Sequence, residues 1–134
     1  MREEIIRYRR ERAGEALEEA EIMYNNGKLF AAVNRIYYAT FYEVFALILT
    51  KGLSSSKHSG VRSLFNKEFV KPKIVSEKHG DFFNKMFEFR QRADYEDFVE
   101  FSKEQIKGWL DMAKDFINSV EQIIEKIVED KKQS

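Results

Sequence analysis

Apolar residues recur every three or four positions along most of the chain, and no stretch alternates apolar and polar residues as a half-buried strand does. This spacing predicts four long helices, over about 3–24, 28–51, 76–93 and 102–130, and one short helix over about 57–69. Asn and Gly residues follow the first two predicted helices, where they tolerate the left-handed backbone that ends a helix. We therefore expect an all-α, up-and-down bundle of four long helices plus one short helix.

Serines mark the predicted starts of the last three helices. Ser54–Ser56 supply candidate N-caps for the short helix, Ser76 caps the next one, and Ser102 opens a capping box. Gly14 and Gly108 fall inside predicted helices, where glycine costs roughly 1 kcal/mol relative to alanine. Close approach of a neighbouring helix and a tolerated surface position explain them equally well.

The second predicted helix, Leu29–Leu49, is apolar on nearly every side. It is either a central helix covered by its own chain or a helix covered in part by a second subunit, since aromatic residues enrich cores and interfaces alike. Arg35 and Glu43 interrupt it, which argues against a membrane span. Arg35, Tyr38 and Tyr42 share one stripe, and an arginine in so apolar a setting needs a carboxylate partner.

The composition is that of a globular protein, with 43% hydrophobic and 34% charged residues. Its 134 residues fit one domain, 1–134, with a core over about 3–130 and a frayed tail over 131–134. The absence of Cys excludes disulfides and thiolate nucleophiles. Two histidines without a His-x-x-x-His pair lead us to expect no metal site and no cofactor. The N-terminus lacks the apolar core of a signal peptide, so we expect a cytoplasmic protein.

Charge balances over the whole chain, with 23 Lys and Arg against 23 Asp and Glu, which argues against a generic nucleic-acid coat or membrane-surface protein. The balance fails locally. Residues 51–78 hold seven Lys and Arg against two Glu, a net charge of +5, whereas residues 88–104 hold six acidic residues against three basic ones. The basic stretch either attracts RNA or nucleotide phosphate, or is a solvated face.

Near the end of the fourth predicted helix, Arg90 and Asp94 are four positions apart and therefore neighbours on one helix face. The two residues form a structural ion pair, or Asp94 pairs with Arg35 instead, or they belong to a polar cluster in which Arg90 binds phosphate oxygens.

Three blocks of sequence, residues 34–42, 57–70 and 89–95, resemble the small stand-alone HEPN-domain proteins of bacteria and archaea (higher eukaryote and prokaryote nucleotide-binding). The resemblance extends over about 13–120. It implies a HEPN-like helical bundle that forms a homodimer. It also implies association with a separately encoded minimal nucleotidyltransferase, in pairs that act as toxin and antitoxin.

In the nuclease branch of that family, an Arg is followed five to seven positions later by a His, and the two cleave RNA. Arg90 matches this Arg, but Tyr95, Glu96 and Asp97 occupy the positions where the His would fall. A phenol with a pKa near ~10 is a poor general base at neutral pH, whereas imidazole near ~6.5 is suited to the task. The departure favours a binding module over an enzyme and leaves catalysis by Arg90 and Tyr95 open.

The resemblance and the charge pattern together predict a dimeric module that binds a nucleotidyltransferase partner, a nucleotide or RNA, with no sequence-specific DNA binding and no membrane association. Two alternatives stay open: a metal-independent endoribonuclease toxin that uses Arg90, and a purely structural dimer. His58, the first of the two histidines, reaches Arg90 only if folding or dimerisation brings the two together. The predicted nucleotide- or RNA-binding residues are Arg90, Asp94, Tyr95, Arg35, Tyr38 and His58.

Overall fold

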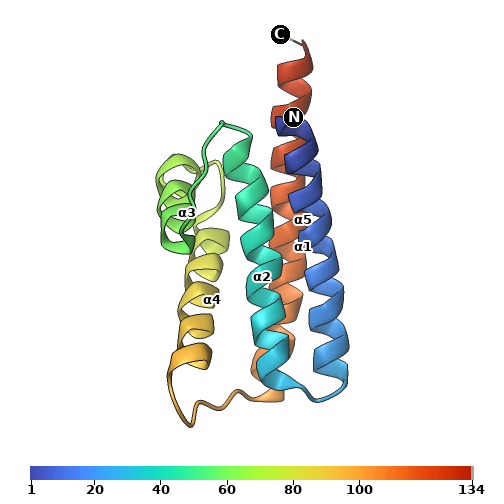
Figure 1. The fold of residues 1–134 in the computed structure, drawn as a ribbon, viewed down its shortest axis with the longest axis vertical. Helices are drawn as coiled ribbons and strands as arrows, with labels where there is room; N and C mark the ends of the chain where they lie inside the picture. Colours follow the sequence, from blue (N-terminus) through green and yellow to red (C-terminus); the bar gives the residue numbers. More distant parts are fainter. Residues whose placement is uncertain (134) are drawn as a thin grey trace.

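A computed structural model describes residues 1–133 and shows the predicted all-α architecture (Figure 1). No strand occurs within this part of the chain. The fold consists of four long helices and one short helix that continues into a π-helical turn. In chain order the elements are α1 (Arg2–Asn25), α2 (Leu29–Leu49), α3 (His58–Phe65), η1 (Asn66–Val70), α4 (Glu77–Tyr95) and α5 (Lys103–Gln133).

Helix α2 occupies the centre of the molecule. It packs against α1 and α5 on one side and against α4 and α3 on the other (Figure 1). Twelve of its 21 residues are buried, so its own chain covers most of its surface, as the first of the two explanations for its apolar sequence requires. Among the half-buried residues of α2, Tyr38, Tyr42, Phe45 and Leu49 form a side of the helix that other helices leave partly open.

Two of the three predicted helix starts are confirmed. The Ser76 hydroxyl accepts a hydrogen bond from the backbone three residues on, and Ser102 and Gln105 form the reciprocal bonds of a capping box at 3.1 and 3.2 Å. The predicted caps of the short helix are wrong. The Ser55 hydroxyl accepts from the Lys57 N–H, which lies before the helix, and α3 starts without a side-chain cap.

Helix α5 continues through Gln133, so the tail predicted to fray from Lys131 is helical as far as the structure describes it, and Ser134 lies outside the described residues. A Cβ atom added to Gly14 or Gly108 would meet nothing within 4 Å, which identifies both as tolerated surface glycines. Within residues 1–133 no helix is long and apolar enough to cross a bilayer.

Candidate functional site

Arg90 on α4 lies against the tyrosines of α2. Its Nη2 donates a hydrogen bond to the Tyr38 hydroxyl at 3.2 Å, and its guanidinium carbon lies 5.4 Å from the Tyr37 ring centroid. Asp94, one turn further along α4, places Oδ2 at 2.9 Å from the Arg90 Nε. The Nε–H is buried and is not directed at an acceptor within residues 1–133. The ion pair therefore fixes the position of Arg90 without satisfying all its donors.

His58, the first residue of α3, joins this group from a distant part of the chain. Its Nδ1 lies 2.9 Å from the Tyr37 hydroxyl, and its ring stacks on Phe41 with centroids 4.1 Å apart. Burial, and then the positive charge of Arg90, lower the pKa of His58 below its usual value. His58 is therefore a neutral imidazole at pH 7. We call Arg90, Tyr37, Tyr38 and His58 the Arg90 cluster.

The Tyr37 hydroxyl sets the protonation pattern of the His58 ring. Tyr37 is fully buried, and burial raises the pKa of its hydroxyl well above the usual range, so the hydroxyl keeps its proton. His58 Nδ1 is the one hydrogen-bond partner of that hydroxyl within residues 1–133, so we assign the hydroxyl as donor and Nδ1 as acceptor. In a neutral ring the proton then sits on Nε2, which makes Nε2 a hydrogen-bond donor.

The two remaining predicted site residues, Arg35 and Tyr95, differ in their surroundings. Arg35 has the carboxylate partner that its surroundings require, Glu19 on α1 at 3.3 Å, and its guanidinium lies 5.1 Å from the Tyr38 ring centroid. Tyr95, in contrast, is 78% exposed. Five positions after Arg90 on a helix with 3.6 residues per turn, it falls on another side of α4.

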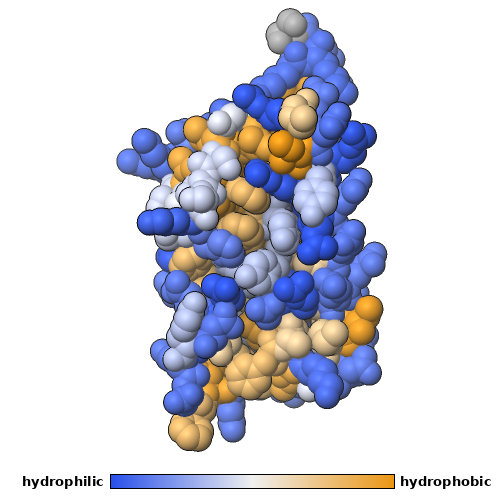
Figure 2. Space-filling model, in the orientation of Figure 1, coloured by the Kyte–Doolittle hydropathy of each residue, from blue (hydrophilic) through white to orange (hydrophobic). Residues whose placement is uncertain are grey.

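A row of arginines covers the half-open side of α2. The guanidinium of Arg9 lies 3.3 Å from the Phe45 ring centroid, that of Arg12 lies 5.3 Å from the Tyr42 ring centroid, and Arg35 and Arg90 flank Tyr38. Figure 2 shows pale and orange side chains in the middle of this face, with blue ones around them. Cations over aromatic faces are attracted to the ring quadrupole. We call Arg9, Arg12, Arg35 and Arg90 the arginine row.

Sequence reasoning missed three contributors to this site: Tyr37, Arg9 and Arg12. The apolar stripe of α2 concealed Tyr37, because a buried tyrosine and a core phenylalanine give the same pattern. Arg9 and Arg12 sit among many charged residues of α1, and only the packing of α1 on α2 distinguishes them.

The assembled groups suit an anion better than a metal. Within residues 1–133 no three His, Asp or Glu side chains gather in a way that could hold a metal ion. A guanidinium and a neutral imidazole N–H donate hydrogen bonds, which oxygen atoms of a phosphate accept.

Comparison with known proteins identifies the family. The sequence model of the HEPN domain matches residues 6–130. A "UPF0332 protein" of Thermotoga maritima is 50% identical over 126 residues, which cover 94% of this chain and 96% of that protein. "Putative toxin MJ0142" of Methanocaldococcus jannaschii is 37% identical over 125 residues, which cover 89% and 85% of the two chains. "Putative toxin MJ0605" of the same organism is 40% identical over 83 residues, 62% of each chain. The chain therefore belongs to the HEPN-domain family.

Proposed function

We propose that this HEPN domain binds the phosphate groups of RNA or a nucleotide at the Arg90 cluster. The observation that carries the proposal is the meeting of the Arg90 guanidinium and the His58 imidazole on two tyrosine rings of α2. Three elements that are far apart in the sequence contribute to it, and folding places two kinds of hydrogen-bond donor next to each other.

The geometry suits a phosphate for two reasons. Arg90 is held by Tyr38 and Asp94, so its planar group is oriented for oxygen atoms that accept two parallel hydrogen bonds. The guanidinium groups of Arg12 and Arg35, which lie over the rings of Tyr42 and Tyr38, offer planar surfaces on which unpaired bases stack. RNA in single-stranded form presents both features together. In this proposal Asp94 positions Arg90, Arg35 extends the basic surface, and Tyr95 lies outside the Arg90 cluster.

Fluorescence anisotropy with a labelled single-stranded RNA 12-mer tests this proposal. Arg90→Ala is expected to weaken binding by roughly tenfold or more, because the contact of the guanidinium with the phosphate is lost. Arg92→Ala is the matched control, since Arg92 is exposed on the same helix and pairs with Glu96 away from the Arg90 cluster. Equal affinity of wild type and a folded Arg90→Ala variant would overturn the proposal.

RNA cleavage is the second candidate, because His58 supplies an imidazole beside Arg90 although the usual position for one holds no histidine. The Tyr37 hydrogen bond argues for binding, since an Nε2 that carries a proton cannot act as a general base. Incubation with RNA, followed by separation on a denaturing gel, distinguishes RNA binding from RNA cleavage. Binding predicts intact RNA, whereas cleavage that disappears in both Arg90→Ala and His58→Gln would assign an endoribonuclease instead.

We also propose that the domain forms a homodimer and works with a minimal nucleotidyltransferase in a toxin–antitoxin pair. Support comes from the family and from the names of the two Methanocaldococcus relatives. Light scattering on the purified protein measures whether it is a dimer. Co-expression with a nucleotidyltransferase from a neighbouring gene, followed by co-purification, tests whether the two proteins associate. A monomer that retains no such partner through purification would contradict both.

A further inference from the structure

The second surface of interest lies where α5 leaves the bundle. In Figure 1 the end of α5 projects past the start of α1 and the end of α2. An open groove of about 780 Å³ runs there between the end of α2, the loop that carries Ile74, and α5. Its apolar floor consists of Ile74, Ile123 and Ile127, and Ile74 is 43% exposed. We call it the terminal groove.

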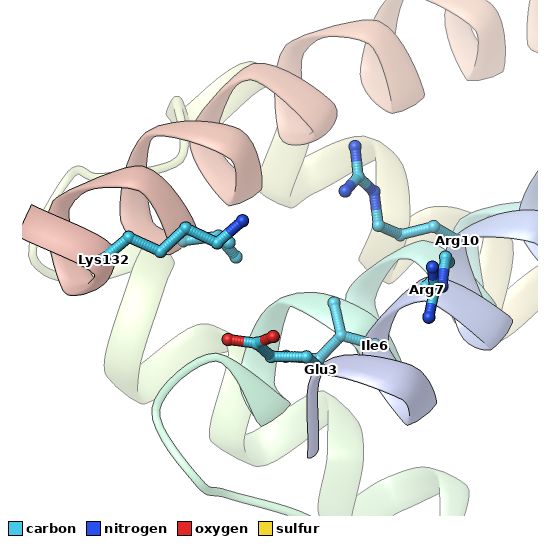
Figure 3. Close-up of a pocket in the computed structure, with 6 residues that line it drawn as sticks. Glu3, Ile6, Arg7, Arg10 and Lys132 are labelled. Carbon is cyan, nitrogen blue, oxygen red and sulfur yellow. The ribbon is translucent and has the colours of Figure 1, made fainter. Parts of the chain in front are cut away.

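Two smaller cavities continue the terminal groove around α5. One of about 210 Å³ shares Thr50 and Lys131 with it, and a second of about 190 Å³ lies between α1 and α5. Figure 3 shows the second, with Lys132 of α5 and Glu3 of α1 pointing into the space between the helices. Ile6 lies between these two cavities and adds to the apolar surface.

The rim of this continuous surface is strongly basic. Seven Lys and Arg line the three cavities, whereas the acidic residues that line them are Glu3 and Asp130. Four of the seven form no ion pair with any residue in 1–133, namely Arg2, Arg7, Lys126 and Lys132. Because the whole chain has a net charge of zero, this excess is local.

We propose that the terminal groove docks an acidic amphipathic helix of a partner protein. The isoleucine floor takes the apolar face of such a helix, and carboxylates on its polar face meet the unpaired cations of the rim. A nucleic acid would use the cations and leave the floor in water. A flat bilayer would not reach the floor, because α5, which lines the groove, continues past the start of α1 and the end of α2.

A designed 16-residue peptide pair tests this docking. The acidic peptide carries Leu at helical spacing with Glu elsewhere, and the control keeps every Leu but replaces each Glu by Lys. We expect the wild-type protein to bind the acidic peptide and not the basic control. Lys126→Glu and Ile127→Glu should each weaken that binding by roughly tenfold, since one removes a rim cation and the other fills the floor with charge.

The controls separate this surface from the Arg90 cluster. Lys107→Glu changes an exposed lysine near the other end of α5 and should bind the acidic peptide as wild type does. Lys126→Glu should keep the RNA affinity of wild type, so failure of one proposal leaves the other standing. Equal binding of both peptides, unchanged affinity in Lys126→Glu, or preferential binding to phosphatidylserine vesicles or RNA at this groove would overturn the docking proposal.

Discussion

Glu43 is the most unusual single residue of the core. It is fully buried in α2, and neither of its carboxyl oxygens has a hydrogen-bond partner within residues 1–133. Burial, together with the neighbouring Glu121 carboxyl, raises the pKa of Glu43 to about 10. Glu121 itself accepts two hydrogen bonds from Arg10, at 2.9 and 3.0 Å. Glu43 is therefore uncharged at pH 7.

Glu43→Gln should stabilise the protein at neutral and alkaline pH. Between about pH 4.5 and 10 the folded state holds a proton that the unfolded state has released, so wild-type stability falls as pH rises through this range. Glutamine needs no proton and its amide can donate to Glu121, so we expect a gain on the order of 1–3 kcal/mol at pH 8. Urea unfolding at pH 5, 7 and 9 measures it. Glu18→Gln on the surface of α1 is the control, and a Glu43→Gln variant less stable than wild type at pH 8 would contradict the assignment.

His58 reports on Arg90 directly. Because Arg90 helps to lower the pKa of His58, Arg90→Ala should raise that pKa toward about 6.5, and Arg92→Ala should leave it unchanged. The pKa in the folded state lies below the unfolded value, so this residue costs stability as pH falls below about 6.5, and Arg90→Ala should reduce that loss. Titration of the His58 ring by NMR measures this pKa in wild type and in both variants. Identical His58 titration in both variants would mean that Arg90 does not act on the imidazole.

Two helical glycines show how packing decides the effect of one methyl group. At Gly80 on α4 a Cβ atom would lie 2.7 Å from the side chain of Val70 at the end of η1, whereas at Gly108 on α5 it would meet nothing within 4 Å. Gly80→Ala should therefore destabilise the fold by about 1–3 kcal/mol. Gly108→Ala should stabilise it by up to ~1 kcal/mol. Thermal unfolding of both variants checks the pair, and equal effects would refute the close contact of η1 with α4.

At the level of elements, periodicity was sufficient to predict the number, order and type of the helices. Ser76 and Ser102 gave correct starts because a cap acts on the next three residues and is a local property. The π-helical turn at Asn66–Val70 was not predicted, since its wider winding preserves the apolar spacing that places Phe65 and Phe69 in the core.

The candidate site was predictable only in part, because its contacts cross the whole molecule. Arg90 and Asp94 are neighbours on one helix, so their pairing followed from spacing. The contacts of Arg90 with Tyr38 and of Tyr37 with His58 join residues 52 and 21 positions apart. Only the packing of α3 and α4 on α2 creates these contacts, and no local pattern encodes it. Tyr95 was placed with Arg90 by sequence proximity, but helical geometry turns it away.

Charge is distributed unevenly over the molecule. The basic stretch 51–78 and the end of α5 lie near one end of the bundle, whereas the connection between α4 and α5, within the acidic stretch 88–104, lies at the other (Figure 1). With a net charge of zero, the molecule lacks a general attraction for nucleic acid, so local groups must supply RNA affinity.

Salt dependence should reveal how few phosphates the protein contacts. The logarithm of the RNA association constant should fall only gently with the logarithm of the salt concentration. In Arg90→Ala this slope should be smaller in magnitude by about one, because each neutralised phosphate releases roughly one counterion. Anisotropy titrations at several KCl concentrations between about 50 and 300 mM measure this slope. An unchanged slope in Arg90→Ala would place the phosphate contact elsewhere.

The arginine row has a consequence for the speed of recognition. A free arginine side chain gives up about 2 kcal/mol of rotamer entropy when a ligand immobilises it. In this fold Arg9 is already fixed by the Phe45 ring and carbonyl, and Arg90 by Tyr38 and Asp94. The ordering takes place during folding, before any ligand arrives. An incoming anion therefore meets donors that need little further rearrangement, and its association rate should be governed by diffusional encounter.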